Sequence, residues 1–549
     1  MRVHCHFFGL ERMTIRNRLR ETTTLTQVAA RHFKFALRRF ARDEDGVLIK
    51  PTIFTFLSML AVGGIGIDLM RMERDRTELQ YTLDRAVLAA ADLDQTQPPS
   101  AVVLDYLTKS GLSEYYEAPV SDIRLGYRKV SSNISTDFEA QFLNFTGVGS
   151  IPIGAASTAE ESIDGLEISL VLDVSGSMNS NSRLSNLKVA AKQFITEMVD
   201  NTTDGKMSIS IIPYATQVSL PDELISQYNA VDPNGLDYSR CVNFQASDFL
   251  TTTLSSSSPL ERTMHFSPWY TDDYRTSGRI IEEHAVCSPY SHREILPFQK
   301  DAVVLKNFID NLWAWGNTSI DIGMKWGTTL LDDTAQPAIH ALTTGASPTV
   351  PSEFSVRPSS YTDPDTLKIV VLMTDGQNTS QYYVKSPHRT GMSDVWYNAS
   401  NRRYSTINNS TGNFWWDGYS GWGNTPNGGS DSVQLSNGEL WARSTIKYVY
   451  YRLFRDWMGS SAAKSKYYYG VRGYHNTSTK DARTKSICDA AKAKGIIVYT
   501  IGFEAPSGGR AVLRDCASSD AHFFDVDGLE IKDAFSSIAT SIRQLRLTQ

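Results

Sequence analysis

The chain has 549 residues, 41% of them hydrophobic and 21% charged, and this balance excludes wholesale disorder. Its formal net charge of −6 gives no basic field for nucleic acid, and five cysteines are too few for a disulfide scaffold. The mean hydropathy of −0.28 excludes a many-pass membrane protein, although such an average is blind to one short span.

One apolar segment follows a basic N-terminal region, residues 1–46. Residues 51–67 carry no charge, and the segment extended to 47–69 is 23 residues long. At 1.5 Å per residue, a helix of that length crosses a hydrocarbon core of about 30 Å. A buried core helix and a secretory signal are the alternatives, but no small-residue cleavage site follows. We therefore predict one transmembrane helix over 47–69.

The residues before this span predict its orientation. Residues 1–46 contain ten Lys and Arg against five acidic residues. Because basic flanks are retained in the cytoplasm, the N-terminus is expected inside and everything after the span outside.

A helical stalk is predicted over residues 70–97. Leu and Ala recur at three- and four-residue spacing from Leu79 to Ala91, and a Pro-Pro pair follows. The span and stalk together contain a Gly, an apolar stretch, a G-x-x-x-D motif and a Leu-Gln…Leu-Asp…Ala-Ala helix. In these features residues 43–91 resemble the N-terminal region of TadG-like proteins of bacterial Flp/Tad (tight adherence) pilus assembly. The resemblance implies a single-pass protein of the bacterial inner membrane with a periplasmic C-terminal domain.

The sequence differs from the pseudopilins of this system at one informative position. Pseudopilins of the same system carry Glu five residues after the Gly, where the processing peptidase reads it. Here Gly46 is followed at that spacing by Pro51, so processing as a pilin is not expected.

Two further regions complete the predicted organisation. Short alternating runs in residues 98–164 favour a small β-rich module. From residue 165 to 549, buried-type strands alternate with amphipathic helices, which is typical of an α/β fold with a doubly wound, mostly parallel sheet. Two polar, aromatic-rich stretches, about 217–295 and 377–445, are predicted to be surface insertions in its loops. The Trp-rich part of the second, 398–430, fits a recognition loop or an ordered lid equally well.

Oxygen-bearing side chains follow the predicted strands of this fold. Asp173, Ser175 and Ser177 form a D-x-S-G-S motif directly after the first strand, and Asp375 follows another. Thr318 stands where a loop meets the helix that begins near residue 319. Since the carboxyl ends of parallel strands form the ligand crevice, these five side chains are expected to converge. Carboxylates and hydroxyls suit Mg²⁺ or Mn²⁺ rather than zinc, so we predict a divalent-cation site; the alternative is a metal-free loop kept as scaffold.

The ordered set D-x-S-x-S, Thr, Asp resembles the metal-ion-dependent adhesion site of von Willebrand factor type A (vWA) domains. The resemblance implies a Rossmann-like vWA domain in which Ser175, Ser177 and Thr318 are hydroxyl ligands. It implies that Asp173 and Asp375 hold the cation directly or through water, and that an acidic side chain of a partner completes the coordination. The segments LPFQKDAVVLKNFIDNLWAWGNTSIDIGMKWGTTLL, AKGIIVYTIGF and LEIKDAFSSIATSIRQLRL resemble the vWA portion of TadG-like proteins.

These features favour a membrane-anchored periplasmic protein of Flp/Tad pilus assembly that binds a partner protein through a metal-bound carboxylate. A pilus-associated or surface adhesin that binds host or surface ligands is the alternative. A hydrolase with its site in the insertions is disfavoured, because no nucleophile elbow, zinc-protease motif or P-loop occurs. A chelatase or chaperone-type A domain is disfavoured because such proteins act with an ATPase in the cytoplasm. No catalytic residue and no enzymatic activity is predicted.

The predicted topology also places the cysteines in two different compartments. Cys5 falls on the reducing cytoplasmic side, which leaves four cysteines in an oxidising compartment. Four cysteines allow three pairings, and order along the chain suggests Cys241 with Cys287 and Cys488 with Cys516.

Overall fold

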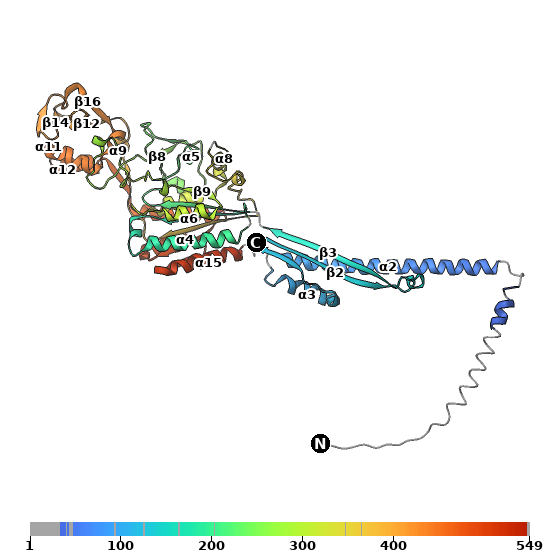
Figure 1. The fold of residues 1–549 in the computed structure, drawn as a ribbon. Helices are drawn as coiled ribbons and strands as arrows, with labels where there is room; N and C mark the ends of the chain where they lie inside the picture. The colour runs from blue at the N-terminus through green and yellow to red at the C-terminus, as the bar shows by residue number, and fades with distance from the viewer. Residues whose placement is uncertain are drawn as a thin grey trace, which may run out of the picture. The chain divides into compact units, whose positions relative to one another are not determined.

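The computed structural model describes residues 33–39, 41–42, 48–92, 95–124, 127–162, 165–202, 204–345, 347–363 and 365–545 (Figure 1). The expectations for Cys5 and for most of the basic segment 1–46 lie outside the described residues. The chain divides into two compact units: Met1–Val87, Ser100–Pro119 and Ser131–Ser157 form the first, and Leu88–Pro99, Val120–Val130 and Thr158–Gln549 form the second.

The first unit is built on one long helix, α2 (Ile49–Ala91), which covers most of the predicted span, 47–69, and most of the predicted stalk, 70–97, without interruption (Figure 1). It is the one helix in the described part of the chain that is long and apolar enough to cross a membrane. Its N-terminal part leaves Phe54, Leu57 and other large apolar side chains exposed, whereas its C-terminal part buries Leu79 and Leu83. The structure thus contains a membrane-anchor candidate that continues directly into a packed helix.

The predicted β-rich module begins with a helix, α3 (Pro99–Lys109), which the sequence analysis did not anticipate. Val102, Val103 and Leu107 are buried, and their helical spacing explains why this segment is not a strand. Beyond it, β1 (Val120–Arg124), β2 (Tyr127–Glu139) and β3 (Ser150–Ser162) form a three-stranded sheet in that order.

A six-stranded sheet is the centre of the second unit. Its order is β19 (Phe523–Val526), β18 (Ile497–Phe503), β10 (Thr366–Thr374), β4 (Gly165–Asp173), β5 (Met207–Tyr214) and β9 (Leu296–Gln299). All neighbouring strands are parallel except β9, which runs antiparallel to β5 at one edge. Every residue of β4 is buried, as expected for a central strand of a parallel sheet that is covered on both faces.

Alternate residues of each strand point to opposite sides of this sheet, so both of its faces carry apolar side chains. Helices cover both faces. One hydrophobic cluster joins the sheet to α4 (Arg183–Asp200), α6 (Ala302–Asp310) and α15 (Ile531–Leu545). A second joins it to α7 (Ile320–Thr329), α8 (Gln336–Thr344), α13 (Thr477–Ala493) and α14 (Ser507–Cys516). The structure confirms a mixed α/β fold.

The first predicted insertion contains a small sheet of β6 (Ala230–Val231), β8 (Leu260–Arg262) and β7 (Val242–Asn243). The second contains a five-stranded sheet with the order β15 (Gly421–Gly423), β14 (Phe414–Trp416), β13 (Arg403–Ile407), β12 (Met392–Asn398) and β16 (Ser432–Ser436). The Trp-rich stretch is therefore ordered, and Trp415 contacts Trp422 with ring centroids 5.4 Å apart.

The second insertion continues beyond the predicted end near residue 445. Strand β11 (Gln381–Val384) pairs with β17 (Arg472–His475), so the intervening chain leaves and returns at one place. Residues 446–469 lie after that predicted end and were therefore assigned to the main α/β domain. Instead Leu453 and Phe454 pack with Trp441 in a third hydrophobic cluster, which contains residues of both insertions.

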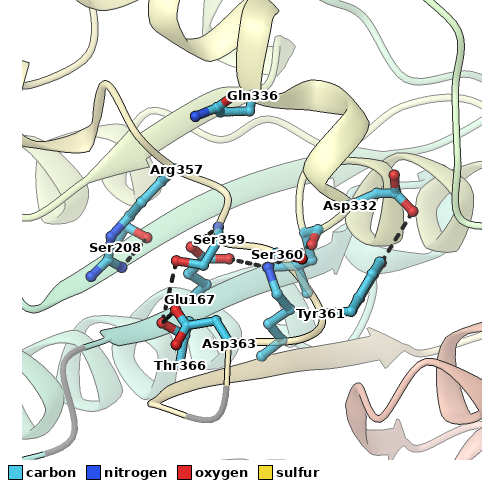
Figure 2. Close-up of polar contacts among 12 residues, drawn as sticks. Glu167, Ser208, Asp332, Gln336, Arg357, Ser359, Ser360, Tyr361, Asp363 and Thr366 are labelled. Atoms are coloured by element: carbon cyan, nitrogen blue, oxygen red, sulfur yellow. Dashed lines mark hydrogen bonds and ion pairs between the residues drawn. The ribbon is translucent and has the colours of Figure 1, made fainter.

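A buried polar network fixes the amino-terminal edge of the sheet. Lys368 of β10 lies beside Glu167 of β4, with Lys368 Nζ 2.7 Å from Glu167 Oε2 and both side chains buried. Figure 2 shows Arg357 beside Ser208, to which its guanidinium donates a hydrogen bond of 3.0 Å. Ser359 N donates to the other oxygen of Glu167 at 2.8 Å. These contacts hold the loop before β10 against the sheet edge opposite the candidate site.

Candidate metal site

The D-x-S-G-S loop leaves the sheet at the carboxyl end of β4. Asp173 is fully buried, and its carboxylate accepts hydrogen bonds from Ser175 N at 2.7 Å and from Thr374 Oγ1 at 2.6 Å. Thr374 is the last residue of the neighbouring strand β10, so the parallel pairing of β4 and β10 brings it alongside. The orientation of the Asp173 carboxylate is therefore fixed by its own loop and by the adjacent strand.

The two serine hydroxyls point to the same place. Ser175 Oγ lies 3.1 Å from Ser177 Oγ, and Ser177 Oγ donates to Asp375 Oδ1 at 2.7 Å. Asp375 directly follows β10 and is 2% exposed, whereas Ser177 is exposed. The site therefore opens to solvent on its serine side.

Thr318 completes the cluster from the loop before α7. A Cβ atom built on Gly376 would stand 3.6 Å from Thr318 Oγ1 and 3.9 Å from Ser177 Oγ, so both hydroxyls face the space that this glycine leaves open. Thr318 N donates to Thr379 Oγ1 at 2.9 Å, which ties the threonine loop to the segment after Asp375. The structure thus brings together all five residues that the sequence singled out: Asp173, Ser175, Ser177, Thr318 and Asp375.

The electrostatics of the cluster favour a cation. Burial is the largest of the effects that raise the pKa of Asp173 to about 7, and the neighbouring Asp375 carboxylate contributes to the same rise. Burial also raises the pKa of Asp375, against the lowering effect of hydrogen bonds from Ser177 and Arg183. Both shifts reflect the cost of holding two carboxylates close together away from water. A hard divalent cation would relieve that cost, and the all-oxygen donor set fits Mg²⁺ or Mn²⁺.

No group of three or more His, Cys, Asp or Glu side chains suited to a metal occurs among the residues that the structure describes. A cation site of the kind predicted here depends on hydroxyls as much as on carboxylates, so it differs from such groups in its chemistry.

Two charged neighbours of the site were missed by the sequence analysis. Arg183, at the start of α4, donates from Nη1 to Asp375 Oδ2 at 2.9 Å and from Nε to Glu504 Oε2 at 2.8 Å. Glu504 directly follows β18, so the rule that ligand residues gather at carboxyl strand ends could have found it. Arg183 balances part of the negative charge of Asp375 and links it to a third strand end.

An aromatic cleft of about 350 Å³ adjoins the metal-site loops. Its floor includes Gly176 and Gly316, whose backbones are joined by a 2.9 Å hydrogen bond from Gly176 N to Gly316 O. Its walls come from both insertions and the loop before Thr318: Pro268, Trp269, Tyr270, Trp315, Asn317, Lys447 and Tyr468.

The two insertions are bound to each other along this cleft. Ile446 N donates to Ser267 O at 2.9 Å, and Thr445 Oγ1 donates to Tyr270 O at 3.0 Å. These bonds hold the aromatic walls in place beside the carboxylate and hydroxyl cluster.

The two disulfides of the structure join Cys241 to Cys287 and Cys488 to Cys516. The first lies in the first insertion and the second links α13 to α14. This is the pairing that order along the chain suggests.

Comparison with known proteins gives one family match. Residues 50–93, which span most of α2, match the family model described as putative Flp pilus-assembly TadE/G-like. No curated protein matches the chain. The resemblance of the N-terminal helix to this family is thereby confirmed.

Solved structures similar to the chain include the pilus adhesin SpaC from Lactobacillus rhamnosus GG, in its open conformation, at 13% identity and a TM-score of 0.30. The match covers 77% of this chain but only 33% of the length of SpaC. The vWF domain of the type V pili tip protein Mfa5 from Porphyromonas gingivalis is similar at 16% identity, with 69% of this chain and 95% of that one covered and a TM-score of 0.30. The PilB minor pilin from Streptococcus sanguinis is similar at 12% identity, with 78% and 77% covered and a TM-score of 0.28.

Proposed function

We propose that the chain is a membrane-anchored vWA-domain protein of Flp/Tad pilus assembly. It binds a divalent cation at a metal-ion-dependent adhesion site and, through that cation, a carboxylate of a partner protein. The observation that carries the proposal is the convergence of two buried carboxylates and three hydroxyls at the carboxyl edge of a mostly parallel sheet. The TadE/G-like match of the membrane-anchor candidate supports the pilus pathway.

The five residues would hold the cation in complementary ways. Ser175, Ser177 and Thr318 offer neutral oxygens, while Asp173 and Asp375 supply negative charge directly or through water. Mg²⁺ readily keeps positions filled by water, and an incoming carboxylate can replace one of them. The exposure of Ser177 supports access from that side. Such a site binds and does not transform its ligand, so the proposed activity is non-enzymatic.

The aromatic cleft beside the site would contribute to selectivity. A side chain next to the metal-bound carboxylate of the partner would enter the space between Tyr270 and Tyr468. Lys447 is exposed there and has no ion-pair partner among the described residues, so it would favour a second acidic group. A partner segment with an acidic residue next to an aromatic or apolar one fits this arrangement, whether it belongs to the pilus apparatus or to a surface ligand.

Thermal unfolding of the full chain in detergent, after removal of metal with a chelator, tests the cation site. We expect the melting temperature to rise with added Mg²⁺, because a ligand that binds only the folded state stabilises that state. At a hundred times the Kd, the free energy of unfolding increases by about 2.7 kcal/mol. Asp173→Ala and Thr318→Ala should abolish that rise while the protein stays folded. Thr362→Ala, at an exposed threonine on the opposite sheet edge, is the matched control and should keep it. An equal Mg²⁺ response in Asp173→Ala would overturn the proposal.

A further inference from the structure

The connection between β2 and β3 contacts the long helix α2 where its apolar part ends. Ala140 N donates to Gly149 O at 3.0 Å and closes the hairpin, and Leu143–Thr146 forms a 3₁₀ turn at its end. Residues 140–149 are called the hairpin tip below. Both contacting segments belong to the first compact unit.

Asp68 binds the backbone of the hairpin tip. Its side chain is fully buried, and Asp68 Oδ2 accepts hydrogen bonds from Phe142 N at 2.6 Å and from Leu143 N at 2.8 Å. These are charge-assisted bonds to backbone donors at the start of a turn, which are stronger than bonds between neutral groups. Asp68 is also the first charged residue after the uncharged stretch 51–67.

Gly64 provides the second contact, one helical turn earlier. A Cβ atom at this position would lie 2.5 Å from Phe142 Cδ1, so only glycine lets the phenyl ring approach the helix this closely. Gly64 and Asp68 are the two defined residues of the G-x-x-x-D motif. The motif therefore acts as a docking site for the hairpin tip.

The position of these contacts sets the depth of the hairpin tip along the helix. Gly64 lies inside the uncharged stretch 51–67, and Asp68 follows about 6 Å further along the helix axis at 1.5 Å per residue. Where α2 crosses a bilayer, the hairpin tip consequently lies at the level where hydrocarbon gives way to headgroups.

The composition of the hairpin tip suits that level. The sequence has no charged residue between Glu139 and Glu160. Phe145 is 89% exposed and Val148 is 42% exposed in the structure. An exposed phenylalanine in a turn costs free energy in water, whereas aromatic rings are stabilised at the membrane interface.

We propose that the hairpin tip inserts into the lipid interface on the non-cytoplasmic side, where Phe145 and Val148 contact acyl chains. The inference rests on the proposed membrane anchor and adds a second membrane contact to it. Tilt and rotation of a spanning helix are set by packing and interfacial anchors, so a docked, lipid-bound hairpin would fix the orientation of α2 in the bilayer.

Site-directed fluorescence on the full chain tests this inference. A Cys5→Ser background carries Phe145→Cys, Asn133→Cys or Leu57→Cys, each labelled with an environment-sensitive dye and reconstituted into nanodiscs of phosphatidylethanolamine and phosphatidylglycerol. Leu57 lies in the apolar stretch, and Asn133 is exposed on β2 far from the tip. We expect the labels at 57 and 145 to lose most of their emission when nitroxide-bearing lipid is included, and the label at 133 to keep it.

The three labels separate the possible failures. Loss of emission at 57 but not at 145 would overturn the tip insertion while leaving the membrane anchor intact. Emission retained at both 57 and 145 would overturn the anchor itself. A blue-shifted but unquenched label at 145 would mean that protein, and not lipid, covers the tip, which also contradicts the proposal. Gly64→Leu should abolish quenching at 145 but not at 57, because it displaces Phe142.

Discussion

Two buried acidic residues at opposite ends of β4 have opposite electrostatic environments. Glu167 is neutralised by Lys368 on the adjacent strand and by a backbone donor. Asp173 accepts hydrogen bonds but has no ion-pair partner among the described residues, and it faces Asp375. A buried charge is costly without a counter-charge. The charge of Glu167 is balanced within the fold, whereas the proposed cation would balance that of Asp173.

Lys368→Met should destabilise the fold strongly, because it leaves Glu167 buried without its counter-ion. Breaking a buried pair in this way typically costs about 3–5 kcal/mol. The double variant Glu167→Leu with Lys368→Met should recover most of the loss, since neither charge remains. Denaturant unfolding of the four proteins measures the free energies; additive losses in the double variant would contradict an interacting pair.

At the scale of elements, the structure differs from the sequence prediction mainly in how far the second insertion extends. The sequence predicted a membrane span followed by a helical stalk, and both lie largely in one continuous helix, α2. It predicted that the second insertion ends near residue 445, whereas β11 and β17 pair across it up to His475. Helical residues between 446 and 469 pack with residues of the two insertions, and a sequence pattern does not tell which core a helix packs against, which explains this difference.

Replacing Cys488 and Cys516 by alanine should lower the stability of the second unit. Their bridge joins α13 to α14 and spans 28 residues, so its loss restores chain entropy to the unfolded state worth about 3–4 kcal/mol. Denaturant unfolding with and without reductant measures the effect. Peptide mapping under non-reducing conditions is the control, and it should recover the Cys241–Cys287 and Cys488–Cys516 pairs and leave Cys5 free. Cys5 in a bridge would contradict the predicted topology.

At the scale of the whole molecule, the proposed membrane anchor predicts a compartment for each part of the chain. Alkaline phosphatase folds only outside the cytoplasm, where its disulfides form. We expect a C-terminal fusion to be active in cells and a fusion placed before the apolar stretch to be inactive, as the basic N-terminal region requires. Activities in the reverse order would contradict the predicted topology and place the candidate metal site in the cytoplasm.

Much of the candidate site could be predicted because its parts are local motifs at strand ends. D-x-S-G-S follows one strand, Asp375 follows another, and the parallel arrangement of strands places their ends at one edge. Glu504 also follows a strand, β18, and the same rule could have found it. Arg183 could not be assigned in this way, since a helix-start arginine pairs with whichever carboxylate the fold brings near it. The aromatic cleft was also not predictable, because its walls come from two insertions far apart in sequence.

The sequence by itself determined the apolar span, the alternation of strands and helices, and the order of the five oxygen donors, because each depends on spacing within a short segment. Only the tertiary structure decided which distant groups meet: Ser177 with Asp375, Glu167 with Lys368, and Gly64 and Asp68 with the hairpin tip. Such contacts depend on strand register and side-chain volume across the fold. No local sequence pattern encodes these contacts. The physical role of the G-x-x-x-D motif is therefore visible only in the structure, where Phe142 packs against Gly64.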